Sequence, residues 1–323
     1  MDWSILSRRK ATTTKPRGAY ANLDELIRIQ FEAKDFSFLP QQPVASVLAG
    51  RYASRLRGRG LNFEELRRYQ PGDDIRTMDW KVTARTRNPH VRVYTEEKDR
   101  SVLLVVDQRI NMFFGTRERM KSVTAAKMAA LGAWRAIDVG DRVGAVVFND
   151  TELEEFRPQR SQGAVMGILH SVLRMNHALN AKTKVEPNPG MLNAALEKAS
   201  RLATHDVLVV LISDFSGVDA ETERLVARIA RHNDLLGFLV HDPVRVNPPS
   251  GHITVSDGSL QVGVNFPDEK VRDKVIDDYR EEQERIRGFL RKLSAPLLMI
   301  NNQEDVVAQV RKHFGIVRGE PGK

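Results

Sequence analysis

Cysteine is absent from the chain of 323 residues. The absence excludes disulfide bonds and zinc sites built on thiolates, and it fits a reducing compartment. Long apolar runs are absent as well, because no stretch reaches the roughly 20 apolar residues that a membrane-spanning helix needs. The basic residues near the N-terminus have no apolar core behind them, which a secretory signal would need. We therefore expect a cytoplasmic protein without a membrane span.

The motifs of several enzyme classes are also absent. The sequence has no Gly-x-x-x-x-Gly-Lys-Ser/Thr loop for ATP phosphates, and Ser213–Gly217 lacks the leading glycine of a nucleophile elbow. His170 and His177 have no carboxylate or third ligand beside them, so we interpret them as residues of a helix surface. No set of residues indicates a hydrolase. We predict a protein that is not an enzyme and has no cofactor.

Aromatic residues make up only 7% of the chain and do not interleave with basic ones, as a surface for single-stranded nucleic acid requires. The net charge is +8: residues 1–20 hold +4 (five basic, one acidic), residues 51–100 hold +5 (13 basic, eight acidic), and the remainder sums to −1. A basic surplus can attract nucleic acid, anionic lipid or an acidic protein surface. A solvated basic face is the simpler interpretation, and we expect no nucleic-acid partner.

Three regions follow one another along the chain. Residues 1–20 are polar and basic, which predicts a disordered tail. Residues 21–100 form an N-terminal region, in which Asn22 caps a short predicted helix that ends near Phe31. From residue 101 to 323, apolar runs alternate with helical patterns. This alternation predicts an α/β domain with a mainly parallel sheet and helices on both faces.

Several elements of this last region have clear sequence signals. The runs Val102–Val106 and Val207–Ile212 are typical of buried strands. A helix is predicted over Arg117–Ile137, with Thr116 as a candidate cap. Near residues 252–264, Asp-Gly between two alternating runs predicts an inserted β-hairpin.

Two aspartates, Asp107 and Asp214, stand at the ends of the two buried strands. Ligands of open α/β sheets bind at the carboxyl ends of the strands, so these positions define a candidate site. Two carboxylates that converge there repel each other without a cation. Arg109 is predicted to supply the cation by pairing with Asp107 or Asp214, because arginine stays charged and binds a carboxylate through two bonds. The alternative is that Arg109 points into solvent.

A second group of residues lies upstream and is rich in both carboxylates and arginines. Pro-Gly followed by two aspartates indicates a turn, and the flanking arginines predict internal ion pairs. We expect this segment to be folded, with its tyrosine and tryptophan buried. Contact with a partner is the second interpretation, and acid–base catalysis is the third. The residues of the pattern are Arg68, Tyr69, Pro71, Gly72, Asp73, Asp74, Arg76, Asp79, Trp80 and Arg85.

This segment resembles the bacterial domain-of-unknown-function 58 family, described as MoxR-associated. The resemblance implies a von Willebrand factor A-like, Rossmann-type sheet from residue 101 onwards. In that fold, Asp-x-Ser-x-Ser, a threonine and a second aspartate bind a metal ion. Here Arg109 and Asn111 replace both serines, and Gly190 opens the second loop's helix without a threonine. The positions Asp107, Arg109, Asn111, Gly190 and Asp214 therefore resemble a degenerate metal site. Magnesium binding stays an alternative, because Asn111 still offers a carbonyl oxygen.

The resemblance also implies partners: a MoxR-type AAA+ ATPase and a client protein. We predict a non-enzymatic adaptor that works with this ATPase in chaperone-like assembly or maturation of a client complex. Its contact face is expected at the strand ends near Asp107 and Asp214, with help from the basic N-terminal region, and Arg117 and Arg119 are expected to take part. The alternative function is a module that binds nucleic acid or an anionic surface through the basic N-terminal region.

Overall fold

The computed structural model describes residues 18–35, 61–71, 73–96, 101–180, 185–245, 251–256, 261–266 and 269–314. The chain forms two compact units, one made of residues 1–42 and 101–323 and the other of residues 43–100. The predicted N-terminal region of residues 21–100 is divided between the two units: its described residues 21–35 belong to the larger unit, and its described residues from 61 onwards belong to the smaller one. Residues 1–17 of the predicted disordered tail lie outside the described residues.

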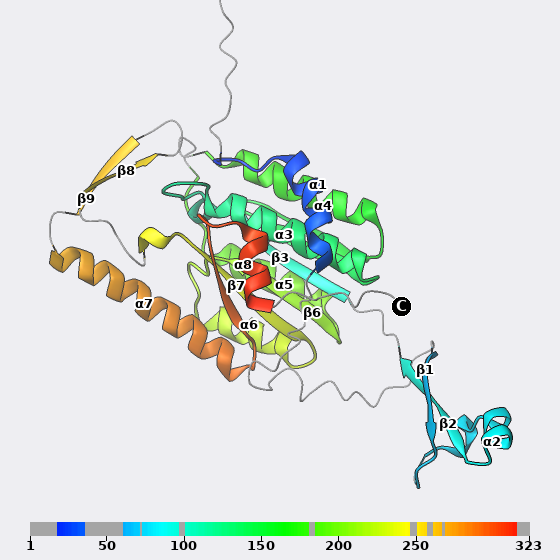
Figure 1. Cartoon of the computed structure of the whole chain (residues 1–323). Helices are drawn as coiled ribbons and strands as arrows, with labels where there is room; N and C mark the ends of the chain where they lie inside the picture. The colour runs from blue at the N-terminus through cyan, green and yellow to red at the C-terminus, as the bar shows by residue number, and fades with distance from the viewer. Residues whose placement is uncertain are drawn as a thin grey trace, which may run out of the picture. The chain divides into compact units, whose positions relative to one another are not determined.

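The larger unit is built on a six-stranded sheet with the strand order β10-β7-β6-β3-β4-β5 (Figure 1). Neighbouring strands are parallel except for β5, which is antiparallel to β4. The predicted α/β class with a mainly parallel sheet is confirmed. The strands are β3 (Ser101–Asp107), β4 (Arg142–Phe148), β5 (Leu153–Gln159), β6 (Val207–Ser213), β7 (Asp234–His241) and β10 (Leu297–Asn301).

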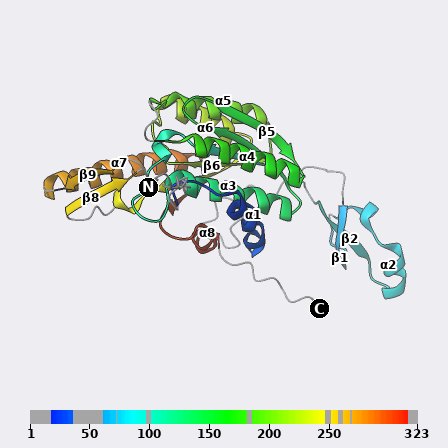
Figure 2. The same ribbon diagram turned by 90° about the horizontal axis from the view of Figure 1, so that it is seen from above.

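Helices cover both faces of this sheet (Figures 1 and 2). One face packs against α1 (Leu23–Glu32), α3 (Lys121–Asp138), α4 (Gln162–Ala178) and α8 (Val306–Phe314). The other packs against α5 (Gly190–Leu202), α6 (Ala220–Ala230) and α7 (Glu269–Lys292). Single 3₁₀ turns are η1 (Ala33–Asp35), η3 (Ile110–Met112) and η4 (Pro243–Arg245). In the described ranges, no helix combines the length and the apolarity needed to cross a membrane.

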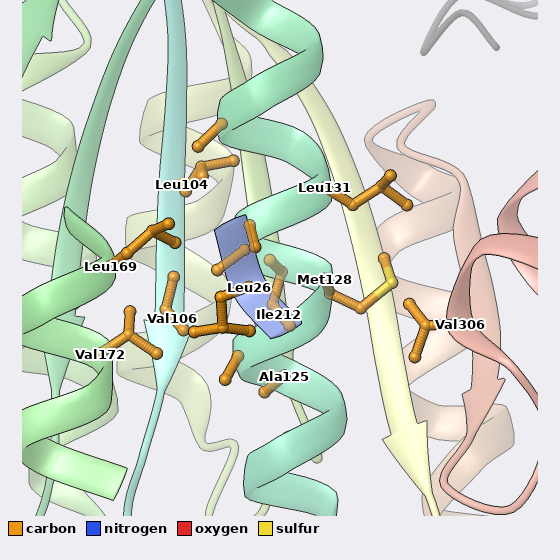
Figure 3. Packing of buried hydrophobic residues seen from close by; sticks show 14 of the residues in the cluster. Leu26, Leu104, Val106, Ala125, Met128, Leu131, Leu169, Val172, Ile212 and Val306 are labelled. Carbon is orange, nitrogen blue, oxygen red and sulfur yellow. The ribbon is translucent and has the colours of Figure 1, made fainter. Parts of the chain in front are cut away.

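Successive residues of the central strand β3 enter the two halves of the core. Leu104 and Val106 point towards α1, α3 and α4, where Figure 3 shows them among the side chains of these helices. Leu103 and Val105 point the other way, towards α5. All four side chains are buried. A strand covered on both faces needs a continuous apolar run, which explains the run from which this strand was predicted.

The helix α1 is part of the larger unit's core. Asn22 caps it as predicted, since its side chain accepts hydrogen bonds from the backbone N–H groups of Asp24 and Glu25. Leu26 is fully buried beside α3 (Figure 3). The indole Nε1 of Trp134 in α3 donates to the carbonyl oxygen of Leu26 at 3.0 Å. Residues 21–33 therefore fold together with α3, although the 87 positions 34–120, which include the small unit, separate the two segments.

A buried polar chain holds the segment that precedes α1. The amide Nδ2 of Asn176 donates to Oε1 of Gln108 at 3.0 Å, and its Oδ1 accepts from the N–H of Ala21 at 2.8 Å. Tyr20 donates its hydroxyl to the carbonyl oxygen of Leu179 at 3.0 Å. Ala19 is 5% exposed. The C-terminal end of the predicted disordered tail is therefore ordered, which corrects the expectation for residues 18–20.

The helix α3 begins later than predicted, and Thr116 does not cap it. Met120 occupies the N-cap position without a side-chain hydrogen bond. The chain before it folds into a tight loop, in which a Cβ on Gly115 would lie 2.3 Å from the carbonyl oxygen of Arg119. Thr116 binds Asp242 at the end of β7 instead. A long-range partner has therefore replaced the local cap.

The small unit is a hairpin of β1 (Leu61–Arg68) and β2 (His90–Glu96), with η2 (Ile75–Thr77) and α2 (Trp80–Thr86) between the strands. The predicted order of this segment is confirmed. The predicted burial of Trp80 is wrong, because its side chain is 65% exposed, and Tyr69 is only half-buried. Val91 is the buried apolar side chain among those described in this unit.

The inserted hairpin is confirmed. It consists of the antiparallel strands β8 (Gly251–Ser256) and β9 (Gln261–Phe266), close to the predicted bounds of residues 252–264. The predicted Asp257-Gly258 turn lies outside the described residues.

Candidate functional site at the strand ends

Three aspartates mark the carboxyl ends of three neighbouring strands. Asp107 ends β3, Asp214 follows β6, and Asp242 follows β7. This edge of an open α/β sheet is where ligands bind. Asp107 and Asp214 were predicted at this edge, whereas Asp242 was missed because no motif marks it.

Asp107 and Arg109 form a buried, two-bonded ion pair. Nη2 of Arg109 lies 2.7 Å from Oδ2 of Asp107, and Nε lies 3.1 Å from Oδ1. The Arg109 side chain is 1% exposed and that of Asp107 is 0% exposed. The predicted pairing is confirmed, and the alternative of a solvent-facing Arg109 is wrong. The guanidinium also lies 5.5 Å from the centre of the Phe148 ring, within the range of a cation–π contact.

The charge of Arg109 is maintained by its acidic neighbours. Burial alone would lower the pKa of Arg109, but the carboxylate of Asp107, with smaller contributions from Asp214 and Asp150, raises this pKa above its usual value. Arg109 is therefore a permanent cation at the strand ends.

A second cation, which the sequence did not reveal, neutralises Asp214. Nζ of Lys121, the first residue of α3, lies 2.6 Å from Oδ2 of Asp214, and both side chains are nearly buried. Burial alone would raise the pKa of Asp214, but attraction to Lys121 and the hydrogen bonds from Lys121 and the Ser216 N–H lower it. Each of the two predicted aspartates thus has its own buried cation.

Ser213 connects the Asp107–Arg109 pair to the backbone of the loop after β6. Its hydroxyl donates to Oδ2 of Asp107 at 2.6 Å and accepts from the N–H of Phe215 at 2.9 Å. Phe215 is buried and adopts a left-handed backbone conformation with φ of 55°. A bulky residue in that conformation is strained, and such strain is concentrated at functional loops. The loop after β6 therefore has a defined, energetically costly shape.

The remaining predicted positions join neighbouring loops. Nδ2 of Asn111 donates to Oγ of Ser216 at 3.2 Å, so it ties the loop after β3 to the loop after β6. Gly190 begins α5 and supplies no side chain to the site.

Asp150 is a further carboxylate that sequence reasoning missed. It accepts from the N–H of Ile110 at 2.6 Å and from the N–H of Asn188 at 2.9 Å. It therefore joins the loop after β3 to the loop before α5. A small pocket of about 70 Å³ lies beside it and is lined partly by Ile110 and Met175. This pocket is much smaller than the roughly 300–1,000 Å³ clefts that hold small-molecule ligands.

Asp242 clamps a third pair of loops. It is fully buried and accepts from the N–H and hydroxyl of Thr116, each at 2.8 Å, and from Nδ2 of Asn302 at 2.9 Å. Asn302 Nδ2 also donates to the carbonyl oxygen of Arg119 at 2.8 Å. This network fixes the loop between β3 and α3 against the loop after β10.

The carboxylates at the strand ends do not fit a divalent cation. Both oxygens of Asp107 accept hydrogen bonds from Arg109, and one accepts from Ser213 as well. The two oxygens of Asp214 are engaged by Lys121 and by the N–H of Ser216. A magnesium ion needs near-octahedral oxygen ligands, and here buried cations already occupy those oxygens. The arrangement is a closed set of ion pairs.

The aspartates of the upstream pattern have structural roles. Asp73 pairs with Arg67 at 2.7 Å, as expected of the flanking arginines. Asp79 caps α2 and pairs with Arg92 at 2.7 Å, a partner that the sequence did not single out. These contacts lower the pKa of Asp73 chiefly through Arg67, and that of Asp79 chiefly through the Val82 N–H. Asp74 caps η2.

Among the described residues, the other arginines of the pattern form no ion pair. Arg68, Pro71, Arg76, Trp80 and Arg85 are exposed, and Gly72 lies outside the described residues. The described residues of the pattern therefore fall into two groups: those that hold the fold of the small unit and those that face solvent.

Comparison with known proteins identifies relatives of this chain. A family model described as "Protein of unknown function DUF58" matches residues 65–285. An uncharacterised protein of Mycobacterium tuberculosis is 30% identical over 272 residues, which cover 84% of each chain. Among solved structures, the chain is similar to the conserved hypothetical protein BatB from Bacteroides thetaiotaomicron, with 12% identity and a TM-score of 0.36 over 60% of this chain and 98% of that one. It is also similar to the SpRpn10 VWA domain, with 11% identity and a TM-score of 0.35 over 70% of this chain and 100% of that one.

Proposed function

We propose that this chain, which belongs to the family described as protein of unknown function DUF58, is a non-enzymatic interaction protein. In this proposal it works with a MoxR-type AAA+ ATPase in the chaperone-like assembly or maturation of a client complex. The strand-end loops of the larger unit form the contact face. The observation that carries the proposal is the neutralisation of Asp107 and Asp214 by buried cations.

Neutralised carboxylates are poor catalysts. A general base must reach the substrate's proton with a free lone pair, but Asp107 is fully buried and engaged by Arg109. Asp214 is likewise held by Lys121. The same contacts stiffen the loops that carry these residues. A rigid set of loops on a scaffold is well suited to binding another protein, because little conformational entropy is lost on association.

The loop between β3 and α3 offers a charged group to a partner. Arg117 is exposed, whereas Arg119 donates to the carbonyl oxygen of Glu304 at 2.8 Å. Charge reversal at Arg119 would therefore also break an internal contact. Arg117→Glu is the cleaner test of the face.

The test measures binding of a MoxR-type ATPase to the immobilised full chain, with ATP, with ADP and without nucleotide. Arg117→Glu should weaken the affinity by about tenfold, mainly through slower association. The matched control is Arg231→Glu, because Arg231 is exposed at the end of α6, next to the start of β7 and away from the strand ends. This control should bind like the wild type.

Three outcomes would contradict the proposal. The ATPase could fail to bind the wild type in every nucleotide state. The two charge reversals could have the same effect, or only the removal of residues 1–20 could weaken binding, and either result would show that the face is misassigned. A steep loss of DNA affinity with rising salt, together with no ATPase binding, would favour the nucleic-acid alternative.

A further inference from the structure

The small unit exposes large apolar side chains in a short segment. Trp80 is 65% exposed and Ile75 is 60% exposed, and Leu66 on β1 is 38% exposed. Single exposed apolar residues are ordinary, but here a tryptophan and an isoleucine lie only five positions apart in one short segment. Tryptophan is also among the residues that contribute most to binding at protein interfaces.

The contacts that hold the fold of the small unit do not explain why these exposed side chains are apolar. The neighbouring aspartates hold the fold, since Asp73 pairs with Arg67 and Asp79 caps α2. Trp80 begins α2 and projects from it without burial. The helix is attached to the hairpin through polar contacts, such as the hydrogen bond from the N–H of His90 to Oγ1 of Thr83 at 3.0 Å.

The contacts of the hairpin place Leu66 and the start of α2 on one side of it. Leu66 and Arg92 are directly opposite each other on β1 and β2, so their side chains lie on the same face. Arg92 reaches across that face to Asp79, the residue before Trp80, at 2.7 Å. This ion pair therefore holds the residue before Trp80 against the face of the hairpin that carries Leu66.

Exposed cations accompany this apolar surface. Lys81 follows Trp80 directly, and Arg85 lies one helical turn after Lys81. Arg76 follows Ile75. Among the residues that the structure describes, none of these three forms an ion pair, whereas Arg67 and Arg92 are both paired. The segment thus combines the exposed apolar side chains of Trp80 and Ile75 with positive charges that no carboxylate neutralises among the described residues.

We propose that Trp80, Ile75 and the cations Arg76, Lys81 and Arg85 form a docking surface for an acidic protein with an apolar recess. This inference rests on the proposed function in one respect only, namely that the protein acts by binding other proteins. The residues of this surface and those of the strand-end face belong to different compact units of the chain. Partner carboxylates complement the cations, and the recess removes the indole from water.

The composition of the surface favours a protein over a nucleic acid. Single strands bind through several aromatic side chains on which successive bases stack. Here Trp80 is the exposed aromatic among the described side chains of the small unit, and its neighbour Ile75 has no flat face for a base. An exposed aliphatic and an exposed aromatic side chain in one short segment fit an apolar recess better.

The test uses the full chain labelled with 5-fluorotryptophan and observed by fluorine NMR. The chain has three tryptophans, and Trp80→Phe identifies the Trp80 signal. The probes are a glutamate–tyrosine copolymer, polyglutamate of the same length, and oligodeoxythymidylate. We expect the copolymer to shift or broaden the Trp80 signal, with a smaller effect from polyglutamate and the least from the oligonucleotide.

Variants then measure how much the surface contributes. Trp80→Ala and Arg85→Glu should each weaken copolymer affinity by about tenfold. The matched controls are Phe31→Ala, since Phe31 is a 68% exposed apolar residue of the larger unit, and Arg231→Glu. Both controls should bind like the wild type. Trp80→Ala should keep the wild-type melting temperature, because an exposed side chain contributes little to the fold.

The proposal is overturned if the copolymer leaves the Trp80 signal unchanged, if polyglutamate matches the copolymer, or if the oligonucleotide has the largest effect. It is also overturned if Trp80→Ala binds the copolymer as the wild type does. A failure of the ATPase to bind contradicts the proposed function alone, because the copolymer measurements do not involve that protein.

Discussion

The guanidinium of Arg109 pairs with the carboxylate of Asp107, two residues earlier, at 2.7 Å and almost completely out of contact with water. The hydroxyl of Ser213 completes the coordination of the carboxylate from the neighbouring strand. A charge pair at this depth needs both members, because either one alone would be a buried, uncompensated charge.

Removing the guanidinium should therefore be costly. We expect Arg109→Met to lower the free energy of unfolding by about 3–5 kcal/mol, since it leaves Asp107 buried without its cation. Urea unfolding measures the change. The double variant Asp107→Asn/Arg109→Met should lose less stability than the sum of the losses of the two single variants.

The control for this prediction is an exposed ion pair. Arg201→Ala removes an exposed pair with Glu197 and should cost at most about 1 kcal/mol. Equal losses for Arg109→Met and Arg201→Ala would contradict the role of burial.

Metal binding should appear only when the internal cations are removed. Calorimetric titration with magnesium or manganese should give no binding to the wild type, because Arg109 and Lys121 occupy the carboxylates. Arg109→Ser with Asn111→Ser frees Asp107 but leaves Asp214 bound to Lys121. We therefore expect the triple variant that adds Lys121→Ala to bind a divalent ion more tightly than the double variant. Micromolar binding by the wild type would refute this explanation.

Stability should depend on the ionisation of Asp214 in acid. Lys121 and the Ser216 N–H outweigh burial and hold the pKa of Asp214 below its ordinary value of 3.8. A carboxyl whose pKa is lower in the folded state stabilises the fold fully above its unfolded pKa of about 4, and this contribution is lost as the pH falls through the folded value.

Asp214→Asn should consequently be less stable than the wild type at neutral pH, and the difference should shrink below about pH 4. Denaturant unfolding at a series of pH values measures it. Glu221→Gln is the control, because Glu221 is an exposed carboxylate whose pair with Arg224 is open to solvent. A constant difference between the wild type and Asp214→Asn down to about pH 3 would count against the buried pair.

The docking of α1 can be tested with two residues of the same helix. Leu26 is fully buried against α3, whereas Phe31 is 68% exposed. Leu26→Ala should lower the free energy of unfolding of the larger unit by about 2–5 kcal/mol, and Phe31→Ala should change it by less than about 0.5 kcal/mol. Thermal unfolding followed by circular dichroism is a suitable measurement. Similar melting temperatures for the two variants would show that α1 is not part of this core.

Features that depend on neighbours along the chain were predictable. The apolar run Val102–Val106 predicts a buried strand because a strand covered on both faces cannot alternate. Asn22 predicts the start of α1 because a cap bonds to amides two or three residues away. The pair Asp107–Arg109 could be predicted for the same reason, since the two charged residues are only two positions apart in the chain.

Features that depend on distant segments were not predictable. Lys121 reaches Asp214 from 93 positions away, and Thr116 leaves its expected cap to bind Asp242, 126 positions away. Nothing near Trp80 in the chain indicates that it is exposed, because burial depends on which other surfaces are present to cover a side chain. The packing of the sheet brings these groups together, and local periodicity carries no information about such contacts. The chain pattern thus specified the strands and caps, whereas the assembled fold decided which charges neutralise each other and which aromatic faces solvent.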